Sequence, residues 1–275
     1  MNILTRWLLS RFSKKARPYL KHYGLLQTVK IYNRTSIVYE PQDEKVLVLA
    51  PHMDDEVIGC GGTLYKHILK GADITVVFLT DGKAGSGTLL NHSVSERRIK
   101  ELELTEIRKK ESKIALKTLG IKEGIFLSGE DSNLHSNDII NDELKMILNK
   151  VRPELVYLPF FLEEHPDHRA VSRILLDAVD DINFNFDCMG YEVWTPLFPN
   201  CYVDISGSVE NKEKALRAYE SQLADKDYVH IHLGLNAYRS NSLLNDNSGY
   251  VEAFFRDSLN GYRKLFDLFA NSLNV

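Results

Sequence analysis

The stretch of sequence that decides the fold runs from residue 45 to residue 56 and reads KVLVLAPHMDDE. Its first half, residues 45–50, is a short apolar run, which is typical of a strand buried on both faces of a parallel sheet. Its second half, residues 51–56, is a turn that places one histidine and three acidic residues directly behind that strand. Because the loops at the carboxyl ends of strands hold the ligand in open α/β sheets, this turn is the first candidate site.

Strand and helix patterns alternate on the carboxyl-terminal side of this turn. Apolar runs predict four more strands, and helical spacing predicts the helices that connect them. The predicted strands are residues 73–80, 124–128, 155–159 and 189–194, and the predicted helices end near residue 70 or span residues 95–119, 138–150 and 169–179. This alternation predicts an α/β fold with a mostly parallel sheet, helices on both faces, and the strand order 3-2-1-4-5.

Beyond residue 195 the pattern changes. We expect a strand at residues 201–206, a helix at 209–221, an irregular polar segment at 225–248 and a helical, aromatic-rich segment at 249–269. These elements would form a carboxyl-terminal α+β elaboration that closes over the sheet. We therefore expect a basic amino-terminal segment, residues 1–43, followed by a single domain, residues 44–275.

Composition excludes several classes of protein. The 275 residues carry a net charge of −4 with ordinary globular composition, which excludes a collagen-like, coiled-coil or mostly disordered chain. Three cysteines are too few for a disulfide scaffold and fit a reducing compartment. No apolar stretch approaches the ~18 residues of a membrane span, and no clean secretory signal precedes the domain. These features predict a cytoplasmic protein.

The first 39 residues carry eight lysines and arginines and no acidic residue, so the rest of the chain is acidic. Trp7, Leu8, Leu9 and Phe12 give this basic segment an apolar side, and a basic amphipathic helix can lie on an anionic membrane surface. We thus expect peripheral contact of residues 1–30 with the inner membrane face, a terminal helix packed on the domain, or a frayed leader. The acidic body and the lack of a recognised motif argue against nucleic-acid binding.

A second unusual loop, His165-Pro-Asp-His168, follows the predicted strand 155–159. In the predicted order, the strands before the two loops are neighbours, so the loops would meet. A catalytic zinc needs three nitrogen or oxygen ligands and one open position. His52, Asp55 and His168 can supply these ligands, although exposed His–Asp pairs are also common on ordinary loops.

The remaining polar residues of the two loops suggest catalytic roles. Asp54 would be free to take a proton from the metal-bound water. His165 would either donate a hydrogen bond to a developing oxyanion or donate a proton to a leaving amine. Asp167 would hold the imidazole of His165 in one tautomer.

The two loops and their surroundings are similar to those of the PIG-L/LmbE-like zinc-dependent N-deacetylases. The family pattern is (P/A)HPDDE at the first loop and HxDH at the second. The resemblance covers about residues 44–256 and rests on these stretches: PHMDDEVIGCGGTL (51–64), VVFLTDGKAG (76–85), RKKESKIALKTLGI (108–121), LPFFLEEHPDHRAV (158–171), KALRAYESQ (214–222) and GYVEAFF (249–255). One departure is Met53, where the family usually has proline, a residue that would stiffen the turn by fixing φ.

The resemblance implies a Rossmann-like fold and removal of an acetyl group from an N-acetylated amino sugar. It assigns zinc to His52, Asp55 and His168, the general base to Asp54 and stabilisation of the tetrahedral intermediate to His165, with Asp167 as its orienting partner. His/Asp sites also accept iron, cobalt or nickel, so other divalent metals stay open.

Weaker signals indicate further contacts with substrate. The resemblance implicates Arg108, in an R-x-x-E pattern with Glu111, in substrate contact; the alternative is a surface ion pair at i, i+3. Asp81 follows the second strand and is placed to line the site. Asp131 follows the third strand, where it would either hydrogen-bond sugar hydroxyls or be an ordinary exposed turn residue. His230 and His232 in YVHIHLG would share one face if this segment were a strand, where a second metal site is conceivable, although solvated or core histidines are the simpler interpretation.

The sequence therefore predicts a metal-dependent hydrolase that releases acetate from an N-acetylated sugar or glycoconjugate. A metal-dependent amidase acting on a different N-acyl glycoconjugate is a second hypothesis. A non-catalytic glycan- or nucleotide-binding module is a third, and it would predict a damaged catalytic set. The sequence leaves the sugar, the aglycone and the oligomeric state open.

Overall fold

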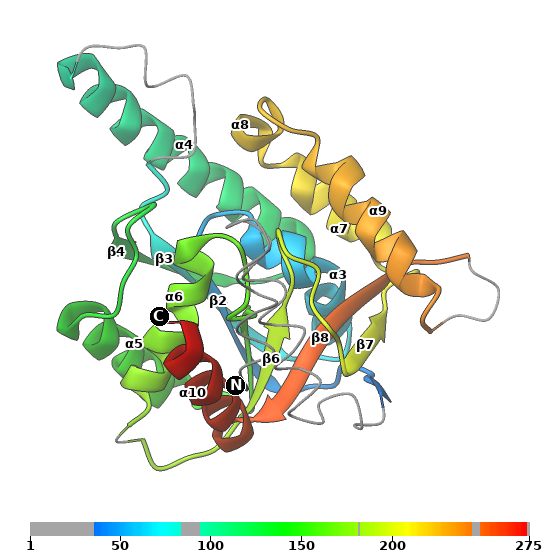
Figure 1. Cartoon of the computed structure of the whole chain (residues 1–275). Coiled ribbons are helices and arrows are strands. Elements are labelled where there is room, and N and C mark those ends of the chain that lie inside the picture. Colours follow the sequence, from blue (N-terminus) through cyan, green and yellow to red (C-terminus); the bar gives the residue numbers. More distant parts are fainter. Residues whose placement is uncertain (1–35, 84–93, 181, 244–247, 274–275) are drawn as a thin grey trace, which may run out of the picture. The chain divides into compact units, whose positions relative to one another are not determined.

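The structure is a computed structural model that describes residues 36–83, 94–180, 182–243 and 248–273 (Figure 1). The chain divides into two units, Met1–Ile37 and Val38–Val275. The segment predicted to contact a membrane, residues 1–30, lies outside the described residues. Each helix in the described part of the chain is too short or too polar to span a lipid bilayer.

Within the described residues, eight strands form one sheet in the order β1-β7-β8-β6-β5-β2-β3-β4. Their bounds are β1 (Ile37–Val38), β2 (Lys45–Ala50), β3 (Asp73–Thr80), β4 (Glu123–Gly129), β5 (Leu155–Pro159), β6 (Asp187–Tyr191), β7 (Cys201–Asp204) and β8 (Val251–Ser258). The run β4-β3-β2-β5-β6 is parallel throughout and matches the predicted order 3-2-1-4-5. The α/β fold with a mostly parallel sheet is confirmed.

Helices cover both faces of this sheet (Figure 1). One layer contains α3 (Asp55–Leu69), α4 (Val94–Leu119), α7 (Val209–Arg217) and α9 (Tyr228–Ser240), which pack on one another. The other contains α5 (Asp138–Val151), α6 (Pro166–Ala178) and α10 (Leu259–Leu273), and the short α8 (Glu220–Leu223) contacts α4. Residues that alternate along β2 divide between the layers: Val46 and Val48 belong to the core beneath α3, whereas the buried Leu47 and Leu49 face the other way.

Three predictions for the carboxyl-terminal part are wrong. The predicted helix 209–221 is interrupted between α7 and α8. Residues 225–248 contain a helix, α9, instead of being irregular throughout. The first half of the predicted helical segment 249–269 is the strand β8, which pairs antiparallel with both β6 and β7. Because β8 is an interior strand, its residues 251–255 are all buried, and the polar–apolar alternation that identifies a strand is missing.

Helix α3, which carries the first loop into the core, is kinked at Cys60 (φ −146°, ψ 15°). The kink separates the Ile58 carbonyl from the Gly62 N–H, which would be partners in a regular helix. Two buried side chains replace the lost bond: Lys212 Nζ donates to Ile58 O at 2.8 Å, and Gly62 N donates to Glu252 Oε1 at 3.0 Å. Lys212, from α7, and Glu252, from β8, also form an ion pair with each other at 2.7 Å. This ion pair therefore holds α3 in its kinked shape.

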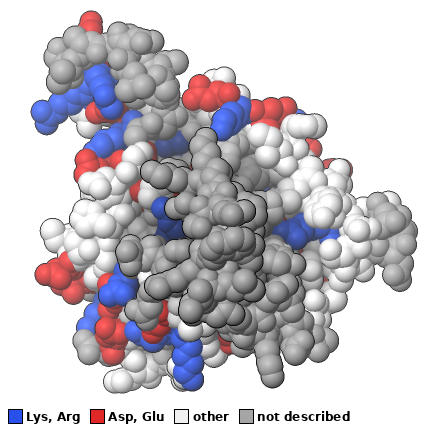
Figure 2. All heavy atoms as spheres, in the orientation of Figure 1, with Lys and Arg blue, Asp and Glu red and all other residues white. Residues whose placement is uncertain are grey.

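On the face shown in Figure 2, acidic and basic side chains are interspersed over the described residues. The described residues form no broad basic surface on this face. A broad basic surface is the electrostatic requirement for nucleic-acid binding.

Candidate metal centre and catalytic pocket

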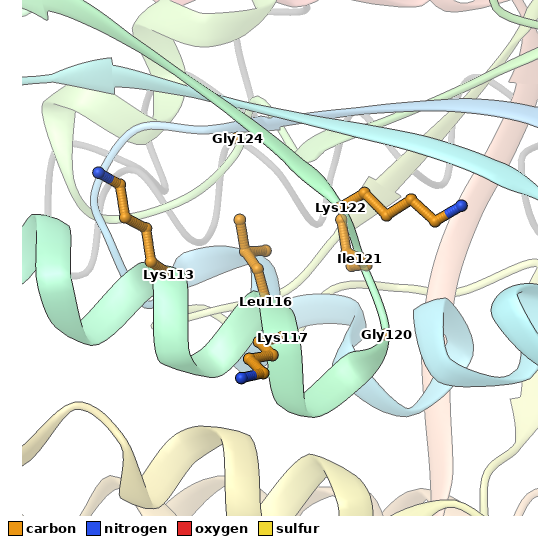
Figure 3. Close-up of a pocket in the computed structure, with 7 residues that line it drawn as sticks. All are labelled: Lys113, Leu116, Lys117, Gly120, Ile121, Lys122 and Gly124. Carbon is orange, nitrogen blue, oxygen red and sulfur yellow. The ribbon is translucent and has the colours of Figure 1, made fainter.

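One pocket in the described structure lies between the end of α4 and the start of β4 (Figure 3). Its lining holds three lysines but neither a histidine nor a carboxylate: Lys113, Leu116, Lys117, Gly120, Ile121, Lys122 and Gly124. It also lies at the amino end of β4, away from the edge of the sheet where α/β enzymes bind ligands. This pocket therefore lacks the groups for acid–base or metal chemistry.

The first predicted loop leaves β2 and turns sharply into α3. The Pro51 carbonyl accepts hydrogen bonds from Thr80 N (3.1 Å) and Thr80 Oγ1 (2.8 Å), which ties the loop to the neighbouring strand. Asp54, the residue before α3, has φ 152° and ψ −26°, a backbone conformation that favours glycine. An aspartate held there costs about 1–3 kcal/mol in backbone strain. Such strain at a buried carboxylate is a mark of a functional position.

The second predicted loop leaves β5 and enters α6. His165 is the residue before the helix, and Pro166 occupies the first helical position, where its missing N–H costs no hydrogen bond. Nδ1 of His165 accepts a hydrogen bond from Asp167 N at 3.2 Å. The helix start thus fixes the ring of His165 and directs Asp167 and His168 inward, where both are fully buried.

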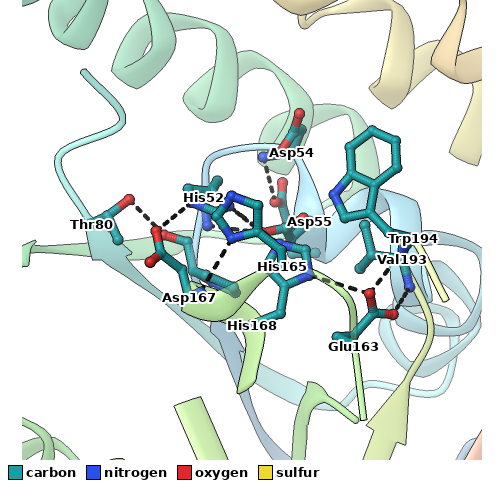
Figure 4. A network of polar contacts seen from close by, with 12 residues as sticks. His52, Asp54, Asp55, Thr80, Glu163, His165, Asp167, His168, Val193 and Trp194 are labelled. Carbon is teal, nitrogen blue, oxygen red and sulfur yellow. Dashed lines mark hydrogen bonds and ion pairs between the residues drawn. The ribbon is translucent and has the colours of Figure 1, made fainter. Parts of the chain in front are cut away.

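The two loops bring three donor atoms into a tight triangle (Figure 4). His52 Nδ1 lies 3.2 Å from Asp55 Oδ2, and His168 Nε2 lies 3.3 Å from each of them. In a tetrahedral zinc site with bonds of about 2.0–2.1 Å, neighbouring ligand atoms are about 3.3 Å apart. The spacing of His52, Asp55 and His168 therefore fits a tetrahedral metal ion that leaves its fourth position open.

The hydrogen bond on the outer nitrogen of His52 supports the same assignment. His52 Nε2 lies 3.0 Å from Asp167 Oδ2, so its proton is placed on Nε2 and the Nδ1 lone pair points into the triangle. The carboxylate of Asp167 also accepts from Ser132 N (2.7 Å) and Leu134 N (3.0 Å). The structure thus corrects the predicted contact: the Asp167 side chain orients His52, and only its backbone N–H contacts His165.

Glu163, which the sequence analysis did not identify, lies next to His168, the third member of the donor triangle. It is 2% exposed, and Glu163 Oε2 lies 3.7 Å from His168 Nδ1, which makes no hydrogen bond within the described residues. Its carboxylate accepts the backbone N–H groups of Val193 (2.6 Å) and Trp194 (3.0 Å). One buried carboxylate therefore connects the donor triangle to the loop after β6.

The electrostatics of the triangle favour a bound cation. Burial alone would lower the pKa of His52, but hydrogen bonds to Asp131, Asp167 and Asp55 raise it well above its usual value. For His168, burial is likewise outweighed by Asp55, and its pKa rises to about 9. These shifts mean that the carboxylates around the two rings attract positive charge, which a divalent metal ion would supply.

Asp54 behaves differently from its neighbour Asp55. Burial, followed by repulsion from Asp55, raises the pKa of Asp54 to about 7. Burial also acts to raise the pKa of Asp55, but His168 and His52 together lower it. The two adjacent carboxylates therefore differ in charge state: Asp55 stays ionised, whereas the pKa of Asp54 lies near that of a general base.

The predicted loops line one pocket at the carboxyl ends of the strands. Its lining residues are His52, Asp54, Asp55, Ile58, Arg108, Asp131, Ser132, His165, Trp194, Gln222 and Tyr228. Six of the nine predicted site residues are among them. Asp167 and His168 are fully buried and are not among the lining residues. Asp81 is not among the lining residues, and its carboxylate lies 3.4 Å from Lys83 Nζ instead.

The R-x-x-E pattern contacts α8 on both of its residues. Arg108 Nη1 donates to Gly82 O at 2.8 Å, and Nη2 donates to Gln222 Oε1. Glu111 accepts hydrogen bonds from Ser221 N (2.8 Å) and Ser221 Oγ (2.6 Å). Helix α8 thus holds Arg108 in place at the pocket. The sequence analysis missed Gln222 because it lies far from Arg108 in the sequence.

Two further groups of histidines and carboxylates come close enough for metal binding among the described residues: His52 with His165 and His168, and His52 with Asp131 and Asp167. Both share His52 and surround the same triangle. His230 and His232 form no second metal site because both lie in helix α9, where residues two apart point in different directions, so the interpretation as solvated or core histidines is confirmed. His230 is exposed, and burial lowers the pKa of His232 to about 3.

Comparison with known proteins agrees with this site. The model of the PIG-L family, described as GlcNAc-PI de-N-acetylase, matches residues 47–179. The diacetylchitobiose deacetylase of Thermococcus kodakarensis is 32% identical over 202 residues, which cover 66% of this chain and 71% of that protein. Among solved structures, the N,N'-diacetylchitobiose deacetylase of Pyrococcus horikoshii with its inhibitor MPG superposes with a TM-score of 0.66 at 27% identity, over 78% of this chain and 84% of that one.

The 4-carboxy-2-hydroxymuconate hydratase of Pseudomonas putida KT2440 superposes with a TM-score of 0.64 over 78% of this chain and 95% of that one. At 20% identity this likeness shows the fold alone. The match to the family model coincides with the two loops of the site, and the Thermococcus relative extends it over most of both chains. The chain therefore belongs to the PIG-L family.

Proposed function

We propose that the protein hydrolyses the acetamide of an N-acetylated amino sugar or glycoconjugate, using a divalent metal ion, with zinc as the expected metal. The products are acetate and a free amine. The observation that carries the proposal is the donor triangle of His52, Asp55 and His168, which lies beside a second carboxylate and a third histidine. The deacetylases named among the relatives support an N-acetylglucosamine-containing substrate.

His52, Asp55 and His168 would hold the metal ion. When bound, the ion supplies Lewis acidity toward the acetamide carbonyl and activates a water molecule. Every other function in the reaction falls to side chains of the pocket.

Asp54 is the proposed general base. Its position at the start of α3 places it in the pocket lining next to Asp55. A cation in the triangle would lower its pKa from about 7, so the carboxylate would be ionised and able to accept the proton of the attacking water. The protonated Asp54 would then return this proton to the departing nitrogen.

His165 is the proposed hydrogen-bond donor to the developing oxyanion. Its Nδ1 accepts from Asp167 N, so the proton of the neutral ring is on Nε2. Burial, together with the neighbouring His52 and His168, lowers the pKa of His165, which keeps the ring neutral near pH 7. Of the two roles open from the sequence, a neutral ring favours hydrogen bonding to the oxyanion over proton donation to the amine.

Arg108 and Asp131 are the proposed contacts for the sugar hydroxyls. Both line the pocket, and Arg108 Nη1 lies 3.8 Å from Asp131 Oδ2. A guanidinium and a carboxylate side by side offer a donor and an acceptor to neighbouring hydroxyl groups. Asp81 remains a weaker proposal because its side chain contacts Lys83.

The two alternative functions predicted from the sequence differ from N-deacetylation in ways that can be tested. An amidase that removes a different acyl group would need the same metal and the same base, and it differs only in the acid released. A non-catalytic binding module would not need a strained, buried Asp54 beside three complete metal donors, so the site favours an enzyme. Oligomer formation and membrane contact of residues 1–30 remain predictions, the latter tested by co-sedimentation with and without that segment.

The test is acetate release from free N-acetylglucosamine and its glycosides, nucleotide-linked and lipid-linked forms, with and without a chelator. Chelator-sensitive acetate release, reduced about 10²–10⁴-fold in Asp54→Asn while the metal stays bound, supports the proposal. Metal binding without acetate from any compound would favour a different acyl group. A protein that binds no metal would favour the binding module.

A further inference from the structure

An aromatic wall, defined as Trp194, Tyr228 and His232, borders the catalytic pocket and has no role in the mechanism above. Trp194 and Tyr228 are among the residues that line the pocket, together with His52 and Asp54. Trp194 comes from the loop after β6, and the other two come from the first turns of α9. Figure 4 shows the indole of Trp194 standing beside the group that contains Asp54 and His165.

The aromatic wall is built from packed rings. The ring centroids of Trp194 and Tyr228 lie 5.6 Å apart at an interplanar angle of 66°, an edge-to-face arrangement. Tyr228 and His232 lie nearly parallel, with centroids 6.1 Å apart. His232 is 3% exposed and uncharged at neutral pH because burial lowers its pKa to about 3, so it serves as an aromatic backing.

The backbone beneath Trp194 is anchored to the metal centre. The buried carboxylate of Glu163 accepts the N–H groups of Val193, Trp194 and Thr195, and it lies 3.7 Å from His168. Burying a carboxylate costs free energy unless its oxygens accept hydrogen bonds. Here these hydrogen bonds fix the backbone of Trp194, whose side chain is still 36% exposed at the mouth of a polar pocket.

The chemistry of the aromatic wall favours a neutral pyranose ring. An aromatic face binds the C–H face of such a ring, whereas the polar residues Arg108 and Asp131 are proposed for the hydroxyl groups of the acetylated sugar. The nearby Lys226, whose Nζ lies 4.8 Å from the centroid of the Trp194 ring, is flanked in sequence by the exposed Asp225 and Asp227. The charge of Lys226 is offset by a neighbouring carboxylate, since burial raises the pKa of Tyr228 and Asp225 lies close enough to that tyrosine to raise it further.

We propose that Trp194 and Tyr228 form a binding subsite for the sugar unit attached to the N-acetylated one. The preferred substrate is then a glycoside of at least two rings and not a free monosaccharide. This inference rests on the proposed function for the identity of the acetylated ring. The subsite itself is a binding property, and it is measurable without turnover.

Fluorescence tests the subsite directly. The chain has two tryptophans, Trp7 and Trp194, so Trp7→Phe leaves Trp194 as the sole tryptophan. In a zinc-loaded Trp7→Phe/Asp54→Asn protein, we expect N,N'-diacetylchitobiose to change the Trp194 emission and to bind at least tenfold more tightly than N-acetylglucosamine. Equal affinity for the two sugars, or unchanged emission when calorimetry shows saturation, would overturn the inference. Tighter binding of a carboxylated or phosphorylated monosaccharide glycoside than of the disaccharide would overturn the choice of a neutral ring.

Kinetics supplies a second test with matched variants. In Trp194→Ala and Tyr228→Ala, we expect kcat/KM for the disaccharide to fall at least tenfold more than kcat/KM for the monosaccharide. Tyr238→Ala, which removes a 69% exposed tyrosine from the same helix, is the control. Equal losses on both sugars, or none, would contradict the subsite. If the wild-type protein releases acetate from neither sugar, the proposed function fails, while the fluorescence titration still decides whether the subsite exists.

Discussion

The Asp167→Asn substitution separates the contact that the structure shows from the one that the sequence predicts. In the structure, three N–H groups point at the Asp167 carboxylate: His52 Nε2 and Ser132 N at Oδ2, and Leu134 N at Oδ1. An asparagine offers one acceptor oxygen and one donor group. Its NH₂ must therefore face at least one of these three N–H groups.

The least costly placement keeps the amide oxygen toward His52 and Ser132 and turns the NH₂ toward Leu134. That placement loses one hydrogen bond to a charged acceptor, which corresponds to about 1.5–3 kcal/mol in the free energy of unfolding. The neutral amide also holds His52 Nε2–H more weakly than a carboxylate does. Substitutions that disturb such a partner of a metal-binding histidine reduce metal affinity by about 10–100-fold.

The assay is competition for zinc between the metal-free protein and a chelating dye, combined with urea unfolding of the metal-free protein. We expect zinc affinity to fall by about 10–100-fold in Asp167→Asn. Asp73→Asn, the same change at an exposed position, is the control and should leave the affinity unchanged. Wild-type zinc affinity with slowed acetate release would show instead that Asp167 acts through His165 and not through His52.

Three further substitutions test the surroundings of the site. Lys212→Met leaves Glu252 buried without its cation. The free energy of unfolding, measured by urea denaturation, should therefore fall by about 3 kcal/mol. A loss under about 1 kcal/mol would contradict the stabilising role of the Lys212–Glu252 pair. Asp54→Gly removes the carboxylate, so it should abolish acetate release. It also relieves the backbone strain at φ 152°, so Tm measured by calorimetry should rise by about 2–4 °C. A lowered Tm would show that Asp54 is not strained. Gln222→Ala frees the Arg108 guanidinium, so KM should rise about tenfold to hundredfold in steady-state kinetics, as expected for losing one hydrogen bond to a charged group, with kcat less affected. A fall in kcat alone would assign Gln222 to the chemical step.

The parallel half of the sheet was predictable because each of its strands is a continuous apolar run bounded by turns. The order of β4, β3, β2, β5 and β6 then followed from the alternation of strands and helices, and with it the meeting of the two loops. The close approach of His52, Asp55 and His168 was predictable for the same reason, since strand order determines which loops are neighbours.

The errors lie where the structure depends on distant contacts. YVHIHLG alternates like a strand, yet it starts α9 because Val229 and His232 pack inward as helix neighbours. Strand β8 carries a buried Glu252, whose charge is acceptable only beside Lys212, and local sequence cannot show that pairing. The contact of Asp167 with His52 spans 115 positions, whereas His165 is two residues away, so proximity in sequence suggested the wrong partner.

In the proposed mechanism, one metal ion held by His52, Asp55 and His168 allows Asp54 to act as the base for N-deacetylation. This mechanism is tested by measuring acetate release from N,N'-diacetylchitobiose as zinc is titrated into the metal-free protein. We expect no release without metal and a linear rise that stops at one equivalent of zinc. Acetate release from the metal-free protein, or none from the protein with one equivalent of zinc bound, would contradict it.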